Sequence, residues 1–127
     1  MEVVSLLLAD PRIDPNRPIF NYMTPLWVSS QNGHLVVVQH LLASGREIDT
    51  KRRSTFNKRT AAEQGRAMGR KARGTDDTEE DYERSKTNGT LCADLIDEYE
   101  RDPVAVRYRV QRQPGLREYF IGTSLPW

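Results

Sequence analysis

The feature that most constrains the fold of this chain is a match between two segments that lie 34 residues apart. Residues 3–8 read VVSLLL, and residues 37–42 read VVQHLL. Each copy continues into a similar tail, RID at 12–14 and REID at 46–49. Repetition at this spacing is typical of stacked-repeat proteins, in which no single unit can bury its own apolar face. We therefore expect an extended binding surface rather than a catalytic cleft.

A second motif precedes the second copy, where residues 24–35 read TPLWVSSQNGHL. The Thr24 hydroxyl can cap a helix, and Pro25 at the first helical position has no N–H to leave unsatisfied. Gly33 suits a tight turn between two helices, because a positive φ is favourable for glycine. The helix after this turn carries one apolar stripe, formed by Val37, Val38, Leu41 and Leu42.

The motif resembles the ankyrin repeat, whose signature T-P-L-H-x-A opens a helix-turn-helix unit of about 33 residues. The resemblance covers Thr24 to Asp49 almost without gaps. It implies an all-α, ankyrin-type solenoid of stacked antiparallel helix pairs. It also implies a protein–protein interaction module rather than an enzyme.

A weaker third copy begins at Thr60, which precedes Gly69 by nine residues, as Thr24 precedes Gly33. Alanines replace the proline and the leucine of the motif, so this unit buries less surface. Its second helix does not follow at once, because residues 70–89 are charged and rich in turn-forming residues. Repeat insertions map to loops, and long ones are usually functional or disordered.

After this insertion the apolar stripe returns at helical spacing, with Leu91, Cys92, Leu95, Ile96 and Tyr99. We therefore interpret residues 52–102 as a degenerate repeat with an insertion at 70–89. The full repeat occupies residues 19–51, and residues 1–18 form a partial repeat that lacks its first helix. Truncation of a longer array, with further ankyrin repeats before Met1, is favoured over a makeshift cap around Glu2.

The C-terminal segment, 103–127, is expected to be a helical cap. Asp102 and Pro103 resemble an N-cap followed by proline at the first helical position. Residues 104–110 alternate between apolar and polar, which on its own suggests a strand, but a helix using Val106 and Val110 fits equally well. The Asp-Pro start favours the helix. A short closing helix would then use Leu116, Tyr119 and Phe120.

Composition agrees with one small domain of 127 residues, of which 37% are hydrophobic and 29% charged. The N-terminus lacks a basic n-region and a cleavage site, so we expect no signal peptide. No run approaches the roughly 18 apolar residues that a membrane span needs. A single cysteine, Cys92, excludes an internal disulfide and fits a reducing compartment. We expect a cytoplasmic protein, with a nuclear location left open.

The sequence predicts no catalytic, metal or cofactor site. His34 and His40 do not share a helical face, and we expect His34 to bond to the backbone near the turn and His40 to be partly buried with its ring edge toward water. Cys92 lies in an apolar stripe and is expected to be a packed, structural thiol. The acidic residues at 76–81 lack the glycine and glutamate offsets of a calcium loop, and solvated disorder accounts for them better.

In proteins that this chain resembles, partners contact the hairpin tips and the exposed face of the first helices. By position, this implies a partner-binding set of Phe20, Asn21, Met23, Trp27, Gln31, Asn32, Phe56, Asn57, Arg59, Ala67 and Met68. Trp27 replaces the histidine of the motif and could be an interface anchor. The alternative, that Trp27 packs between neighbouring first helices, is slightly favoured.

Both hairpins depart from the pattern of the family. Residues 19–22 read IFNY where Asp and Gly normally stand, and Lys58 stands where a glycine belongs. A positive φ is difficult for most side chains, and asparagine tolerates it best. We therefore expect irregular hairpins.

An alternative function is non-specific contact with nucleic acid or another anionic surface through the basic segment 51–73. From Arg46 to Arg73 there are ten Lys or Arg against three acids. Such clusters bind phosphates with a steep salt dependence. Phe56 is the one aromatic within the segment, and adjacent acids can neutralise it, so a protein partner is preferred. The residues of this alternative are Lys51, Arg52, Arg53, Lys58, Arg59, Arg66, Arg70, Lys71 and Arg73.

Overall fold

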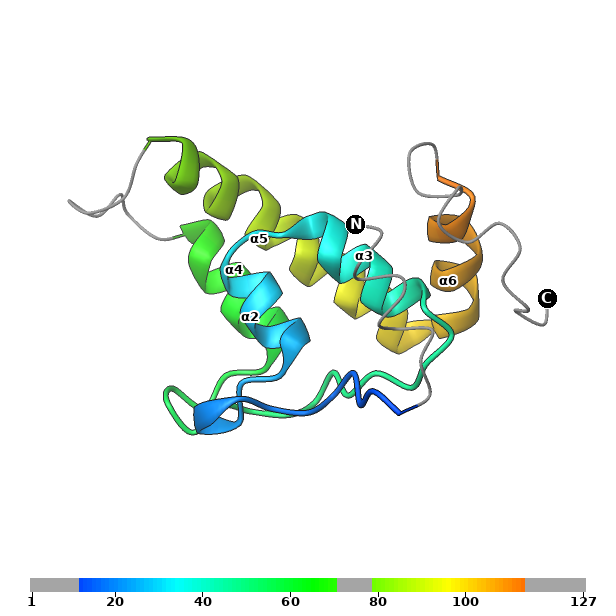
Figure 1. The fold of residues 1–127 in the computed structure, drawn as a ribbon. Coiled ribbons are helices and arrows are strands. Elements are labelled where there is room, and N and C mark those ends of the chain that lie inside the picture. Colours follow the sequence, from blue (N-terminus) through cyan, green and yellow to red (C-terminus); the bar gives the residue numbers. More distant parts are fainter. Residues whose placement is uncertain (1–11, 71–78, 114–127) are drawn as a thin grey trace.

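The computed structural model describes residues 12–70 and 79–113. Within these ranges every helix or strand assignment is helical, which confirms the all-α prediction (Figure 1). The helices are η1 (Phe20–Tyr22), α2 (Pro25–Gln31), α3 (Leu35–Ala43), α4 (Ala61–Arg70), α5 (Glu79–Arg101) and α6 (Pro103–Gln111). The matched segment 3–8 and the proposed closing helix at Leu116, Tyr119 and Phe120 lie outside the described residues.

Helices α2 and α3 form the hairpin that the motif predicts. The Thr24 hydroxyl accepts a hydrogen bond from the Trp27 amide at 3.2 Å, so Thr24 is the N-cap, and Pro25 occupies the first helical position. The turn between the helices passes through Gly33, whose φ is 67°. A side chain at this φ would be strained, which explains why glycine stands there.

Residues 103–111 form helix α6, which starts at the predicted N-cap and proline. The Asp102 side chain accepts a hydrogen bond from the Ala105 amide at 3.1 Å, and Pro103 is the first helical residue. The strand alternative for residues 104–110 is therefore wrong. Helix α6 packs against α3 and α5, and the Gln111 side chain donates to the Ala43 carbonyl at the end of α3 at 2.6 Å.

The second helix pair consists of α4 and α5, which make extensive contact along their length (Figure 1). A capping box starts α4, because the Thr60 amide donates to the Glu63 carboxylate at 2.9 Å and the Glu63 amide donates back to the Thr60 hydroxyl at 3.3 Å. Helix α5 is 23 residues long and begins at Glu79. The predicted loop at 70–89 is therefore wrong for residues 79–89, which extend the helix.

A physical reason for this extension lies in the start of α5. Two acids, Glu79 and Glu80, stand in the first turn, where negative charge is favourable against the positive end of the helix dipole. Both side chains are exposed, so this turn is solvated yet helical. The charged composition that suggests a loop is thus also compatible with an exposed helix.

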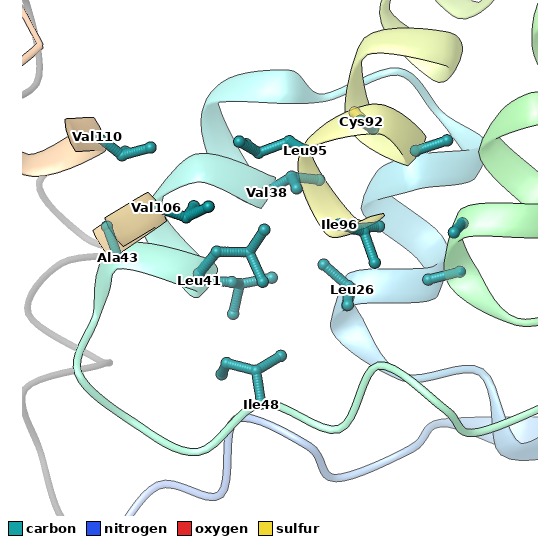
Figure 2. Packing of buried hydrophobic residues seen from close by; sticks show 14 of the residues in the cluster. Leu26, Val38, Leu41, Ala43, Ile48, Cys92, Leu95, Ile96, Val106 and Val110 are labelled. Carbon is teal, nitrogen blue, oxygen red and sulfur yellow. The ribbon is translucent and has the colours of Figure 1, made fainter. Parts of the chain in front are cut away.

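One apolar core joins all five α-helices (Figure 2). The predicted stripes supply much of it, since Val38, Leu41 and Leu42 of α3 and Cys92, Leu95 and Ile96 of α5 are all buried. Leu91 is an exception to its stripe, because its side chain is exposed. The remaining buried apolar residues are Leu26, Trp27, Ala43, Ile48, Ala61, Ala62, Ala93, Val106 and Val110.

Two glycines bring α4 and α5 together. A Cβ atom added to Gly65 would lie 2.6 Å from the Gly89 carbonyl oxygen, and a Cβ atom added to Gly89 would lie 2.6 Å from the Gly65 carbonyl oxygen. Both distances are shorter than any normal contact. Ala93 lies beside the same crossing, so the backbones of the two helices approach closely there.

Segments that lie 31 to 34 positions apart in the chain are linked by hydrogen bonds. The tails that match in the sequence also have the same turn, because Asp14 accepts from the Asn16 amide at 2.9 Å and Asp49 accepts from the Lys51 amide at 3.0 Å. The linking bonds are Arg46 to the Ile13 carbonyl, the Asn16 side chain to the Glu47 carbonyl and the Asp49 amide, Thr55 to Asn21, Trp27 to the Arg59 carbonyl, and Gln64 to Gln31.

No helix in the described ranges combines the length and the apolar character needed to cross a lipid bilayer. Likewise, the described side chains include no cluster of three or more histidines, cysteines or acids arranged to hold a metal ion.

Candidate functional site

The two hairpin tips, residues 19–23 and 54–59, lie side by side at one edge of the molecule (Figure 1). The Thr55 amide donates to the Asn21 carbonyl at 2.8 Å, and the Thr55 hydroxyl donates to the Asn21 side-chain oxygen at 3.3 Å. The Arg52 guanidinium lies over the Tyr22 ring, 5.6 Å from its centre. These contacts join the two tips into one surface, called the tip surface below.

The backbone at the tip surface adopts an unusual conformation at residues that depart from the family pattern. Asn21, Tyr22 and Lys58 have φ values of 58°, 57° and 61°, all in the left-handed region. Lys58 is the residue that stands where a glycine belongs, so the chain keeps the turn without the residue that favours it. The expectation of irregular hairpins is confirmed. A tyrosine and a lysine in this region store strain of the order of 1 kcal/mol each.

Polar side chains hold the second tip in shape. The Asn57 side-chain oxygen accepts from the Ser54 hydroxyl at 2.9 Å and from the Arg59 amide at 3.1 Å. Its amide group donates to Gln64 of α4 at 2.9 Å. The Lys58 amide closes the turn by donating to the Ser54 carbonyl at 2.9 Å. Asn57, one of the predicted partner-binding residues, is thus occupied by contacts within the turn.

Trp27 is the clearest correction to the predicted partner-binding set. Its side chain is 0% exposed, so it is not an anchor on an open surface. The indole N–H donates to the Arg59 carbonyl at 2.9 Å, and α2 packs against α4 around it. The structure therefore agrees with the alternative, in which Trp27 packs between neighbouring first helices. Through its hydrogen bond to Arg59, Trp27 also holds the second tip against α2.

The remaining residues of the predicted set divide by exposure. Asn21, Asn32, Phe56 and Arg59 are exposed. Half-buried residues are Met23, Gln31, Asn57, Ala67 and Met68.

Two of the half-buried side chains make contacts between helices. The Gln31 side-chain oxygen accepts a hydrogen bond from the Gln64 side chain of α4 at 3.2 Å. Met68 lies against Gly89 of α5, so it faces a neighbouring helix. For Phe20 the structure describes the backbone in η1 but not the side chain.

Three residues at the tip surface were missing from the predicted set. Ile19 and Tyr22 on the first tip are 55% and 52% exposed, and Phe56 on the second tip is 68% exposed. Lys58 is also exposed, next to Phe56 in the turn. The signal that could have found them is their departure from the pattern of the family, because each stands in a hairpin where a small or turn-forming residue is normal.

Charge at the tip surface is strongly one-sided. The two tips together with the residues just before them, 17–23 and 51–59, contain six Lys or Arg and no Asp or Glu. Acids outside the tips pair with half of them, namely Glu100 with Lys51 at 3.1 Å, Asp49 with Arg52 at 3.5 Å and Glu63 with Arg53 at 2.8 Å. The other three, Arg17, Lys58 and Arg59, have no carboxylate partner among the described residues.

The same pairing reduces the free charge of the wider basic segment. Arg66 pairs with Asp94 at 3.1 Å and also with Asp97. These two acids raise the pKa of Arg66, chiefly through the hydrogen bond to Asp97. Lys71 and Arg73 lie outside the described residues, as does the side chain of Arg70.

The titratable groups elsewhere have structural surroundings. His40 is fully buried, not partly as expected, and its Nδ1 lies 2.8 Å from the Val36 carbonyl oxygen. Burial lowers the pKa of His40, and the hydrogen bond to Val36 opposes this. His34 is exposed, and its backbone amide, rather than its ring, bonds to Ser29 at 2.9 Å. Burial raises the pKa of Cys92 to about 12, which fits the expected packed thiol.

Comparison with known proteins agrees with this geometry. Residues 21–53 match the ankyrin repeat family, so the chain contains about one complete repeat of this kind. The match starts in η1 and ends in the segment before the second tip, and it includes both α2 and α3. Ankyrin repeats are in general non-enzymatic scaffold units that bind other proteins. No curated protein and no solved structure shows a significant match to this chain.

Proposed function

We propose that this chain is a protein–protein interaction module in which two stacked ankyrin-type units present the tip surface to a partner. The observation that supports this most is the exposure of Ile19, Tyr22 and Phe56 together, on two hairpins joined by the Thr55–Asn21 hydrogen bond. Exposed apolar side chains grouped in this way are typical of interaction sites.

Stacking of the units supports the same proposal. The hydrogen bonds between residues 31 to 34 apart link equivalent parts of successive units, as a solenoid requires. The α4–α5 pair then serves as the degenerate repeat, and α6 covers the end of α3 and α5 as a cap. Because the units are tied to one another at the tips, the surface is already arranged before a partner binds, which lowers the entropic cost of binding.

The first-helix face plays a smaller part in this proposal than the sequence suggests. Trp27 is buried and Met68 contacts α5, so neither is available without local rearrangement. Asn32 is the exposed member of the set on this face. We therefore place the main contact at the hairpin tips. A cytoplasmic location remains part of the proposal, supported by the single buried cysteine.

Site-specific photo-cross-linking tests the proposed function. A photoreactive amino acid replaces Phe56 at the tip surface in one variant and Val104, which is exposed on α6, in a control variant. After irradiation in an extract of the source cells, we expect a protein that is cross-linked from position 56 and not from 104. That protein is then made in pure form and its Kd for the chain measured. Cross-links from position 56 mainly to nucleic acid would contradict the proposal, as would equal protein yields from both positions.

A further inference from the structure

We propose that the tip surface binds an acidic polypeptide segment that carries bulky apolar side chains. This inference deepens the proposed function by naming the class of partner, and it rests on that function. It depends on three features of the tip surface, which are its apolar exposure, its one-sided charge and its fixed shape.

The apolar part of the tip surface is unusually open. Phe56 is 68% exposed and is the most exposed large apolar side chain that the structure describes. Ile19 and Tyr22, on the adjacent tip, are each more than half exposed. An aromatic, an aliphatic and a second aromatic side chain on joined hairpins can enclose an apolar side chain of a partner, and such aromatic residues often dominate binding energy.

The positive charge of the tip surface favours a negatively charged partner. Arg17, Lys58 and Arg59 have no carboxylate partner among the described residues, and no acid lies in either tip sequence. Arg59 is hydrogen-bonded to the neutral Gln64 side chain at 3.3 Å, so its charge is not compensated there. Complementary negative charge on the partner would steer association and favour the correct orientation.

The number of unpaired cations favours a polypeptide over a nucleic acid. Binding to a phosphate backbone gains most of its strength from many cations that each neutralise a phosphate. Here Lys51, Arg52 and Arg53 are already paired with carboxylates of the same chain, and Arg52 also covers the Tyr22 ring. This leaves a small number of free charges around an apolar centre, which matches alternating acidic and apolar side chains better than a continuous row of phosphates.

The backbone at Lys58 offers a way to remove a charge without weakening the fold. Its φ of 61° favours glycine, so Lys58→Gly removes one free cation and relieves strain at the same position. A variant that folds better and binds less well cannot be explained by unfolding. Phe56→Ser removes the apolar centre, and its side chain is exposed, so the fold does not depend on it.

The test measures fluorescence anisotropy of labelled synthetic probes with the full chain. The first probe is a peptide of alternating glutamates and leucine or phenylalanine residues. Matched probes carry glutamine in place of glutamate, or serine in place of the apolar residues, and a fourth is a single-stranded oligonucleotide of equal length. We expect the first probe to bind at least about tenfold more tightly than each of the others.

Variants then locate the binding. Phe56→Ser is expected to weaken binding of the first probe about tenfold and Lys58→Gly about threefold, while Tyr108→Ser on α6, which replaces another exposed aromatic, leaves it unchanged. Circular dichroism checks that each variant is folded. Tighter binding of the oligonucleotide, equal binding of the glutamine probe, absence of binding by the first probe, or an equal loss in Tyr108→Ser would each overturn the inference. If cross-linking at position 56 meanwhile captures a protein through a neutral or basic segment, the proposed function stands and only the acidic partner class fails.

Discussion

The two helix pairs of this molecule, α2–α3 and α4–α5, are packed by opposite means. The α2–α3 pair is filled with large side chains, of which Trp27, Leu26 and Leu42 are among the largest fully buried ones. The α4–α5 pair has alanines and glycines at its contact, and the Gly65 and Gly89 backbones nearly touch. The first pair is joined by a short turn through Gly33.

The difference shows that a helix pair without the signature residues of the first pair can still pack closely. When the threonine-proline-leucine start becomes Thr60-Ala61-Ala62, the first helix presents less apolar volume. The loss is offset because small residues allow the backbones to approach, which restores contact at close range. The cost is that the second pair tolerates no additional atoms at the crossing.

Removal of the Trp27 side chain is the strongest test of the first packing mode. Trp27→Ala leaves a large cavity between α2 and α4 and frees the Arg59 carbonyl, so we expect a loss of about 4 kcal/mol in the free energy of unfolding, measured by urea denaturation. Trp27→Phe keeps most of the volume and loses the hydrogen bond, and should cost about 1 to 2 kcal/mol. A loss below about 1 kcal/mol for Trp27→Ala would show that this side chain does not hold α2 against α4.

Addition of one methyl group tests the second packing mode. Gly65→Ala places a Cβ atom 2.6 Å from the Gly89 carbonyl oxygen, so α4 and α5 must move apart. We expect a loss of about 2 to 3 kcal/mol in the free energy of unfolding, although alanine is the better helix former by about 1 kcal/mol. Thr90→Ala, at an exposed position beside Gly89, serves as the control and should have little effect. A stabilised Gly65→Ala protein would contradict the close crossing.

A glycine at position 58 sharpens the comparison at the hairpins. Gly33 has a φ of 67° and fits the turn of the first pair, whereas Lys58 adopts 61° before the second pair. We expect Lys58→Gly to raise the free energy of unfolding by about 1 kcal/mol, because it relieves left-handed strain and keeps both backbone hydrogen bonds of the residue. Gly33→Ala is the matched control and should have the opposite sign. The midpoint of thermal unfolding measures both.

The smallest expected effect is a loss of stability in mild acid, which arises from the α2–α3 pair alone. His40 of α3 directly precedes Leu41 in the sequence and is buried. Asp94, which directly precedes Leu95 in α5, is exposed. Burial lowers the pKa of His40 below its ordinary value of 6.5, so the unfolded chain binds a proton more readily than the folded one. Stability is therefore full above pH 6.5 and falls as the pH drops toward the folded pKa.

The measurement is the urea midpoint at pH 7.5 and pH 5.5. We expect a loss of under about 1 kcal/mol across this interval, since one unit of pKa corresponds to about 1.4 kcal/mol. His40→Leu, which replaces the titrating ring with an apolar side chain, should make the two midpoints converge. If the variant keeps the full dependence, another group is responsible. Glu63 would not explain it, because the Thr60 hydrogen bond lowers the pKa of Glu63 below 4.5, so its effect appears only at more acidic pH.

Local residues were sufficient to predict the first helix pair. Thr24, Pro25 and Gly33 act through bonds and torsions within a few residues, so their roles are independent of the rest of the chain. The same holds for Asp102 at the start of α6. The strand alternative for residues 104–110 arose because side chains alternate in polarity there, and the N-cap was the better guide.

Surface exposure was harder to predict, as the partner-binding set shows. Trp27, Met68 and Asn57 were placed at the interface by position, but each contacts a neighbouring helix or turn. Trp27 contacts Arg59, 32 residues further along the chain, and Met68 contacts α5, so the exposure of both depends on distant segments. Asn57 is instead enclosed by its own turn and by Gln64, seven residues on. Ile19 and Tyr22 depart from the family pattern within their own hairpin, but no local pattern indicates that two tips become one surface.

By itself, the sequence determined the helical units, their caps and the turn at Gly33, because these follow from torsions and hydrogen bonds between residues close in the chain. Only the tertiary structure decided that residues 79–89 continue a helix, that Trp27 is enclosed, and that Lys58 accepts a positive φ. The helix at 79–89 and the enclosure of Trp27 depend on contacts with segments distant in the chain, at Gly65 and Arg59. The positive φ of Lys58 is held by a closed turn, in which the Lys58 amide donates to the Ser54 carbonyl, against the ordinary preference of lysine.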